Sequence, residues 1–212
     1  RARNIWCSGP LPASSYASEI HGVSDTELLS LRRSFASVLK PRAGDRSLSI
    51  LLLLEEDPTW LVQVSPILRW HKEVWNTRMA VHSSTLSFQQ LRSAWDSVFS
   101  VREKTWRSVS GPISAMRKSL SRIGWEMVDF ITLISDQGHD ISLTLQSPGM
   151  LRLLLKDAVL RQLERQIGEK NNFPNRACFD IVVKHLHSKR YTPLEKGVLR
   201  SVASGAHWTR LY

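Results

Sequence analysis

The feature of this sequence that most constrains its fold is a series of helix-start signals, each followed by apolar residues at helical spacing. Ser24-Asp25-Thr26-Glu27 and Ser87-Phe88-Gln89-Gln90 both have the pattern of a capping box, in which the first and fourth residues cap each other's backbone amides. The first signal predicts a helix that ends near Lys40-Pro41. The second predicts the longest helix of the chain, over about residues 88–107.

Proline and glycine mark further helix boundaries. Ser65-Pro66 predicts a break between two helices, the second of which ends near Met79. The leucine-rich block 48–54 favours a short buried helix over a strand. Gly111-Pro112 begins a helix that ends at Gly124, a residue suited to a left-handed C-cap. We expect three more helices, over about residues 148–168, 177–189 and 193–204.

The periodicity changes between residues 130 and 145. Two β-type runs, 130–134 and 140–145, flank a short turn that contains Gly138, which is typical of a hairpin. The sequence therefore predicts a mainly α fold, a multi-helix bundle with one β-hairpin at about residues 130–145. We expect an irregular N-terminal segment over 1–22, a first helical subdomain over 23–80 and a second one, with the hairpin, over 86–212.

Positive charge is concentrated in two regions. The formal net charge is +10, of which residues 101–125 contribute +5 and residues 151–212 contribute +7, whereas residues 126–150 contribute −4. Two basic regions on either side of an acidic hairpin indicate a surface that binds a polyanion, because each neutralised phosphate releases counterions. A solvated surface that is merely basic is the alternative.

The basic side chains of these regions are the candidate nucleic-acid-binding residues. Arg117, Lys118 and Arg122 share the helix face opposite the apolar positions, so we expect them to face solvent. The first candidate set is Arg102, Lys104, Arg107, Arg117, Lys118 and Arg122, and the second is Arg161, Arg165, Lys184, Lys189 and Arg190. A solvated helix face without a ligand is the alternative for both sets.

Other chemistries have weak support in the sequence. Two cysteines cannot form a cysteine-based zinc site, and His185 and His187 would point about 200° apart on a helix. We find no glycine-rich phosphate loop and no nucleophile elbow, and we predict no catalytic residue, cofactor or metal. The longest apolar run, Ile50 to Leu54, is far too short to span a membrane.

Eight tryptophans are a further peculiarity of the composition. Indole rings stack on bases in some single-strand-binding proteins, but they also bury large apolar areas. Trp95 and Trp106 fall on one apolar stripe of the predicted 88–107 helix, so we expect core packing for most of the eight. Trp208, in a short polar tail, is the one we expect to be exposed.

Several short motifs resemble a known family. Tyr16-Ala17-Ser18-Glu19-Ile20-His21-Gly22-Val23, followed by Leu31-Arg32-Arg33, resembles the segment after the polymerase core of non-LTR (LINE-type) retrotransposon reverse transcriptases, with Ala17 and Ser18 in place of the usual small pair. Further motifs resemble features of related retroelement polyproteins: Asp57-Pro58, Glu73-Val74-Trp75, Gly111-Pro112, Ile123-Gly124-Trp125, Asp136-Gln137-Gly138 and the final His207 to Tyr212.

The resemblance implies a thumb or connector fragment that holds template and product and is not an enzyme by itself. Polymerases of this class need paired aspartates for two metal ions, and the chain has no Asp-Asp dipeptide, so the catalytic aspartates would lie upstream. The implied partners are nucleic acid (RNA, DNA or a hybrid) and an upstream polymerase domain, without a membrane. The implied location is intracellular, with the nucleus as one option. The alternative function is a helical protein–protein interaction scaffold that docks a neighbouring domain through apolar faces such as Leu48–Leu54.

Overall fold

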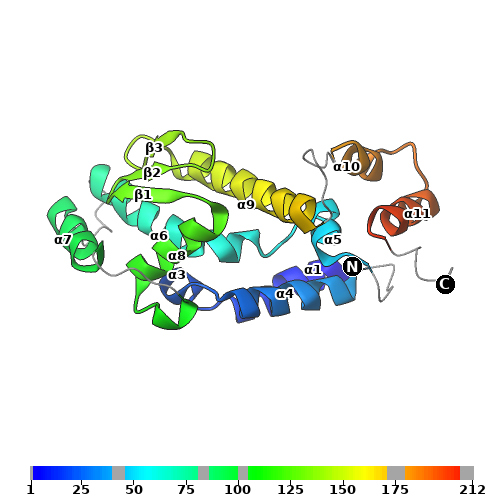
Figure 1. Ribbon diagram of the computed structural model, residues 1–212, viewed down its shortest axis with the longest axis horizontal. Helices are drawn as coiled ribbons and strands as arrows, with labels where there is room; N and C mark the ends of the chain where they lie inside the picture. The colour runs from blue at the N-terminus through cyan, green and yellow to red at the C-terminus, as the bar shows by residue number, and fades with distance from the viewer. Residues whose placement is uncertain (1, 40–45, 81–85, 100–104, 171–179, 206–212) are drawn as a thin grey trace. The chain divides into compact units, whose positions relative to one another are not determined.

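A computed structural model describes residues 2–39, 46–80, 86–99, 105–170 and 180–205. The chain is mainly helical with a small three-stranded antiparallel sheet, which confirms the predicted fold class (Figure 1). Its elements are α1 (Ala2–Ser8), α2 (Pro10–Ser14), α3 (Ser18–His21), α4 (Asp25–Val38), α5 (Leu48–Leu54), α6 (Trp60–Arg78), α7 (Phe88–Phe99), the 3₁₀ helix η1 (Trp106–Ser108), α8 (Pro112–Ile123), β1 (Glu126–Asp129), β2 (Thr132–Ile134), β3 (Asp140–Ser142), α9 (Pro148–Lys170), α10 (Asp180–His187) and α11 (Pro193–Ala203).

The chain forms two compact units. Unit 1 contains Arg1–Ser14, Leu29–Thr59 and Leu160–Tyr212, and unit 2 contains Ser15–Leu28 and Trp60–Val159. Each unit draws on both of the predicted helical subdomains, 23–80 and 86–212, because the segments of the two units alternate along the chain. Two of the four boundaries between the units fall within α4 and α9, and the other two fall between α2 and α3 and directly before α6.

The core of unit 2 is formed by α6, α7, α8, the sheet and the first part of α9. Figure 1 shows α3, α6 and α8 side by side, and the predicted inward face of α8 is buried there. Ile113, Met116 and Leu120 pack with Trp125 and with apolar residues of α6. As predicted, Gly124 ends α8 in the left-handed conformation, at φ 75°.

One continuous helix, α6, replaces the two helices predicted to break near Pro66. Proline has no N–H, so the carbonyl four residues earlier, that of Val62, loses its usual backbone donor. The Ser65 hydroxyl donates to that carbonyl at 2.9 Å, and its oxygen also lies 3.0 Å from the Ser18 hydroxyl of α3. A side chain next to the proline therefore replaces the missing hydrogen bond, a compensation that the proline signal alone does not reveal.

The helix predicted over residues 88–107 is also wrong at its C-terminal end. α7 begins as predicted, with the amide of Ser87 donating to Gln90 and that of Gln90 to Ser87. Residues 100–104 lie outside the described part of the chain, and Trp106 belongs to the separate turn η1. The periodicity predicted that Trp95 and Trp106 share one apolar stripe of a single helix. Trp106 lies outside α7, so this prediction is wrong.

The predicted hairpin forms between β2 and β3, in which Leu133 pairs with Ile141. A third strand, β1, pairs antiparallel with β2 and was not predicted. The connection from β1 to β2 is tight because the Asp129 carboxylate accepts the amide hydrogen of Ile131 at 2.8 Å. β1 has four residues with only a weak alternation of burial, which explains why its sequence gives little strand signal.

Unit 1 contains the N-terminal helices α1 and α2, where the sequence predicted an irregular segment. Trp6 of α1 is buried, packs on Phe35 of α4 at 5.1 Å between ring centroids, and donates its indole N–H to the Ser34 hydroxyl. This contact between residues far apart in the sequence stabilises α1, although the neighbouring sequence is rich in Pro and Ser and is typical of a loop. α5 is a buried helix, as predicted.

We expect the cost of removing the Ser65 hydroxyl to depend on Pro66. Ser65→Ala leaves the Val62 carbonyl and the Ser18 hydroxyl without this partner inside the protein, and it should lower the free energy of unfolding by about 1–2 kcal/mol. In a Pro66→Ala background residue 66 regains an N–H, so the same change should cost less. Urea unfolding of the two single variants and the double variant measures this coupling, and simple additivity would contradict it.

His71 should make the stability of unit 2 depend on pH. Its Nε2 donates to the carbonyl oxygens of Leu143 (3.1 Å) and Gln146 (3.0 Å), and burial lowers the pKa of His71 below its ordinary value of about 6.5. The folded state therefore binds this proton less readily than the unfolded state. Stability should be complete above pH about 6.5 and fall as the pH drops toward the folded-state pKa. His71→Gln keeps an N–H donor without this titration, so urea unfolding between pH about 5 and 7.5 should show a shallower slope for the variant.

Candidate nucleic-acid interface

The first candidate set belongs to unit 2, and its members differ in their surroundings. Arg102 and Lys104 lie outside the described residues. Arg107 is exposed in η1, and Lys118 is half-buried on α8. The remaining two, Arg117 and Arg122, are both engaged with neighbouring elements.

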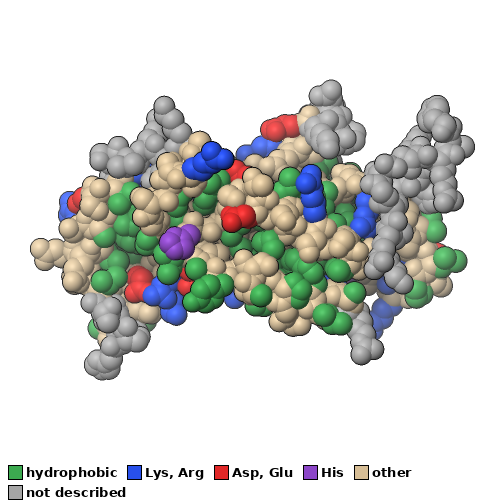
Figure 2. Space-filling model, turned by 90° about the horizontal axis from the view of Figure 1, so that it is seen from below, with side chains coloured by type: hydrophobic (Ala, Val, Ile, Leu, Met, Phe, Trp, Pro, Cys, Tyr) green, Lys and Arg blue, Asp and Glu red, His purple; other side chains and the backbone are tan. Residues whose placement is uncertain are grey.

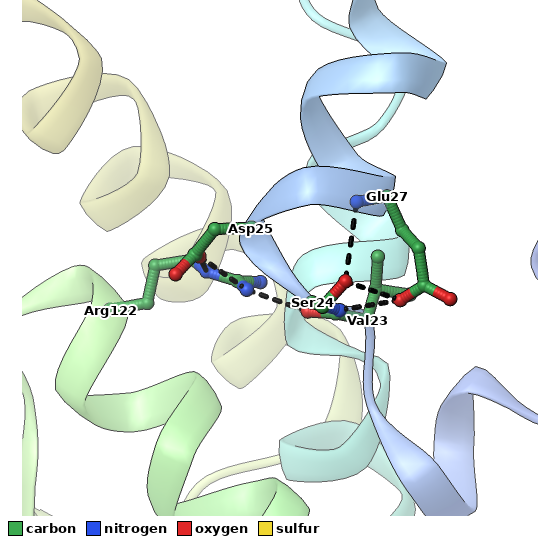
Figure 3. Close-up of polar contacts among 5 residues, drawn as sticks. All are labelled: Val23, Ser24, Asp25, Glu27 and Arg122. Carbon is green, nitrogen blue, oxygen red and sulfur yellow. Dashed lines mark hydrogen bonds and ion pairs between the residues drawn. The ribbon is translucent and has the colours of Figure 1, made fainter. Parts of the chain in front are cut away.

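Arg122 fastens α8 to the start of α4 (Figure 3). Its Nη2 donates to the Val23 carbonyl at 2.6 Å and lies 2.7 Å from the Asp25 carboxylate. The guanidinium carbon also lies 4.5 Å from the centre of the Trp106 ring. Only 12% of the side chain is exposed, so the prediction that Arg122 faces solvent is wrong. The reason is that η1 brings Trp106 over the end of the guanidinium, which the straight helix predicted for 88–107 would not do.

Trp106 also packs closely on Gly22. A Cβ atom built on Gly22 would lie 2.6 Å from the Trp106 ring, and Gly22 has a left-handed φ of 68°. Only glycine suits both the conformation and the space. Figure 3 also shows the predicted capping box of α4, in which the Ser24 amide donates to the Glu27 carboxylate at 2.8 Å and the Glu27 amide to the Ser24 hydroxyl at 3.2 Å.

Arg117 is the second engaged arginine. Its Nη1 donates to the Val98 carbonyl near the C-terminus of α7 at 3.0 Å, and its guanidinium lies over Trp95 at 5.9 Å. A cation at a helix C-terminus is favoured by the carbonyls that have no partner within the helix. Arg117 therefore joins α8 to α7 and is half-buried, contrary to the expectation that it faces open solvent.

The second candidate set belongs to unit 1 and is more exposed. Arg161, on α9, is half-buried, and Arg165, one turn later, is exposed and donates to Gln162 at 3.2 Å. Lys184, Lys189 and Arg190 are all exposed at and after the end of α10.

Residues 184–191 form what we call the basic turn. It contains Lys184, Lys189 and Arg190, two histidines and Tyr191, and no Asp or Glu. Leu186 is 4% exposed and anchors the turn, while the rings of His185 and Tyr191 meet edge to face at 5.3 Å. Sequence reasoning identified its cations but not the aromatic contact between them.

Some carboxylates of unit 1 are turned inward. Asp57 is almost completely buried and lies 2.7 Å from Arg32, and it also accepts the Thr59 amide hydrogen at 2.9 Å. Glu55, 11% exposed, pairs with Arg200 of α11 and lies 3.9 Å from Arg3 of α1. Unit 1 has 17 Lys and Arg against 8 Asp and Glu, whereas unit 2 has 12 against 11, so most of the net charge belongs to unit 1.

The tryptophans are mostly inside, as expected from the sequence. Trp6, Trp70, Trp95 and Trp125 are buried, and Trp60, Trp75 and Trp106 are half-buried. Each of these half-buried rings lies next to a guanidinium: Arg152 at 5.5 Å from Trp60, Arg78 at 5.6 Å from Trp75, and Arg122 at Trp106. Trp208, which we expected to be exposed, lies outside the described residues.

The view in Figure 2 shows how charged side chains are distributed on one face. Lys and Arg side chains stand mostly singly there, separated by apolar and uncharged ones. The basic turn is a local concentration of cations within the sequence of unit 1. Among the described residues, no three or more His, Cys, Asp or Glu are placed to hold a metal ion, and no helix is long and apolar enough to cross a membrane.

The structure also contains a pocket that sequence reasoning missed. It has a volume of about 410 Å³ and lies in unit 2 between α8 and β1, where Arg117, Lys118, Ser121 and Glu126 line it. No short sequence pattern predicts this pocket, because part of its lining comes from the turn at Gly124 and from strand β1, which was not predicted.

Comparisons of the chain with protein-family models, with curated proteins and with solved structures found no match. Any assignment of function therefore depends on the sequence and on the side chains described above.

Removing Arg122 should destabilise the protein, whereas removing an exposed cation should not. Arg122→Gln loses the ionic contact with Asp25, the bond to the Val23 carbonyl and the contact with Trp106, and we expect a loss of about 2 kcal/mol in unfolding free energy. Arg107→Gln, an equal change of charge at an exposed site, should alter it by less than about 0.5 kcal/mol. Urea unfolding compares them, and equal stabilities would contradict an anchoring role for Arg122.

Proposed function

We propose that this chain is a non-catalytic nucleic-acid-binding segment that contacts phosphates through the basic turn. The observation that carries the proposal is the exposure of Lys184, Lys189 and Arg190 within seven residues that contain no Asp or Glu. Phosphate contacts of this kind position a protein on nucleic acid without reading its sequence. RNA, DNA and a hybrid all present the same phosphate charge, so each is a possible ligand of the turn.

The aromatic members of the turn favour nucleic acid over other polyanions. Tyr191 and His185 are exposed beside the three cations, and aromatic rings between cations can stack on bases. Arg165 and Arg161 on α9 belong to the same unit and add to its positive charge. Asp57 pairs with Arg32 and Glu55 pairs with Arg200, so these two carboxylates are engaged with arginines of unit 1.

We further propose that the segment derives from a LINE-type retroelement polyprotein, where it would act as the thumb or connector after the polymerase core. The resemblance of residues 16–23 and of Leu31-Arg32-Arg33 supports this origin. Polymerisation would then belong to an upstream domain with paired aspartates, since this chain has no Asp-Asp dipeptide.

A second candidate function, a docking scaffold, is favoured by one observation. Leu194, Val198 and Val202 of α11 are spaced four residues apart and are 79%, 50% and 53% exposed. The Leu48–Leu54 segment, which the sequence suggested as a docking surface, is not available to a partner. Its residues Leu51 to Leu54 are at most 8% exposed and belong to the buried core.

Neutralising the basic turn should weaken binding and flatten its dependence on salt. For a Lys184→Gln, Lys189→Gln, Arg190→Gln variant, the slope of log K against log salt concentration on duplex DNA should fall by about 2–3, since each phosphate contact contributes roughly 0.9. Fluorescence anisotropy with labelled duplexes of two unrelated sequences measures both affinity and slope, and the loss should be similar for the two.

The control replaces three exposed cations of unit 2, Arg69, Lys72 and Arg92, by Gln; Arg69 lies 2.7 Å from Glu73 and Arg92 3.9 Å from Asp96, so these cations stand beside carboxylates. It changes the net charge by the same amount and should leave the slope nearly unchanged. Equal slopes for the basic-turn variant and the wild-type protein would contradict the proposal and favour the scaffold.

A further inference from the structure

The last helix of unit 1, α11, presents a row of apolar side chains to solvent. The structure describes all 11 residues of this helix, and none of them is buried. Leu194, Val198 and Val202 lie four residues apart, so they form one row along the helix, and each is at least half exposed. An amphipathic helix of a folded domain normally turns such a row toward the core. In α11 the row faces outward instead.

Polar contacts hold α11 on the rest of unit 1. Arg200, which lies about 200° around the helix from Val198, pairs with Glu55 at the end of α5. The carbonyl oxygen of Ser204, just after α11, accepts the amide hydrogen of Ser47 at 2.8 Å. The apolar row is therefore not needed to attach the helix, and it is available to a partner.

Gly197, next to the apolar row, is not required by its own surroundings. A Cβ atom built on it would meet no atom within 4 Å, and its backbone is not in the left-handed conformation. Glycine inside a helix is unfavourable relative to alanine. Gly197 and Ser201 also lie four residues apart, so these small residues form a shallow groove beside the apolar row. Close approach of another backbone would account for the glycine.

A ridge and a groove on the same face make α11 complementary to itself. When two helices pack, a row of large side chains from one helix fits the groove between the rows of the other. In a pair related by a two-fold axis each copy supplies both parts, because the same surface is used twice. Antiparallel pairing would place Val198 beside Val198 of the second copy, and Leu194 near the Val202 of the second copy.

Charge also favours an antiparallel pair. Lys189 and Arg190 are exposed in the basic turn, just before α11 begins at Pro193. In an antiparallel pair these cations would lie near the end of the other helix, where carbonyl groups without helical partners favour positive charge. The 11 residues of α11 span about 16 Å, so the two basic turns would be farther apart than the screening length of about 8 Å. A parallel pair would bring the turns together.

We infer that α11 is the contact surface of a homodimer, in which the α11 helices of two copies pack antiparallel through Leu194, Val198 and Val202. The inference rests on the docking surface of the second candidate function, to which it assigns a partner, and it does not require phosphate binding by the basic turn. One pair of short helices is a small interface compared with the roughly 1,200 Å² of a stable complex, so we expect a weak dimer with a Kd of about 100 µM.

Sedimentation equilibrium of the whole chain between about 5 and 500 µM tests the inference. The wild-type protein should pass from monomer to dimer over this range. Val198→Lys places a charge in the contact and should weaken association about tenfold or more. Leu153→Lys, the same kind of change at an exposed leucine of α9, should alter association by less than about twofold. A wild-type protein that stays monomeric at about 500 µM would leave the row to a different partner and overturn the inference, as would Val198→Lys that associates like the wild type.

Gly197→Ala separates helix packing from helix stability. Alanine favours the helix and the open space beside Gly197 admits its methyl group, so the urea midpoint should stay the same or rise. In a close helix pair the two added methyl groups would push the backbones apart, so association should weaken about fivefold or more. Unchanged association in this variant would contradict close packing of a second helix at Gly197.

Cysteine substitutions test the direction of the pair. In a Cys7→Ala, Cys178→Ala background, Val198→Cys should form a disulfide-linked dimer with a mild oxidant, because antiparallel pairing brings this position of both copies together. Leu194→Cys should link far more slowly, since its two copies would lie about 12 Å apart along the helices, whereas a disulfide needs Cβ atoms within about 4.5 Å. Equal linking at both positions would indicate a parallel pair and overturn the antiparallel arrangement.

The outcomes are distinguishable from those for phosphate binding. Duplex DNA binding is measured at protein concentrations far below the expected Kd, where the chain is monomeric, so Gly197→Ala should keep the salt dependence of the wild type. The Lys184→Gln, Lys189→Gln, Arg190→Gln variant should still associate, about two- to tenfold more weakly. Absence of DNA binding alone would therefore contradict the phosphate contacts, and absence of self-association alone would contradict the homodimer.

Discussion

In unit 2, two guanidinium groups each lie over an indole ring and donate to a backbone carbonyl, and each joins α8 to a neighbouring element. Arg122 joins α8, η1 and the start of α4 in this way, because one side chain contacts Trp106, the Val23 carbonyl and Asp25. A half-buried cation is tolerated only where its N–H groups find acceptors, and here the acceptors are backbone oxygens that need donors. Gly22 is part of the same arrangement, since any side chain there would meet the indole.

Local signals in the sequence predict local structure well. The capping boxes at Ser24 and Ser87 and the left-handed end of α8 at Gly124 depend on residues within a few positions of each other, and all three form. Distant contacts explain the failures. Trp6 makes α1 helical by packing on Phe35, twenty-nine positions away, which no pattern near residue 6 indicates.

The same distinction explains the outcome for the candidate site. Clustering of cations along the chain suffices to find the basic turn, because an exposed loop at the end of a short helix brings consecutive residues to one place. On α8 the helical periodicity predicts in which direction the Arg117 and Arg122 side chains point. It does not predict which groups of other elements they contact. The indoles and carbonyls that meet them come from α7, η1 and the α3–α4 connection, and the pocket likewise depends on a turn and a strand outside the helix.

Internal ion pairing decides where the charge of unit 1 acts. Pairing removes one acid and one base together, so it leaves the net charge unchanged. It does change the position of the remaining charge, because Glu55 and Asp57 neutralise Arg200 and Arg32 at buried or half-buried sites. The field that a ligand meets then originates from the charges that remain exposed, and at physiological salt it extends only about 8 Å. Three such cations within seven residues therefore attract a phosphate chain more strongly than the same number spread singly over a surface.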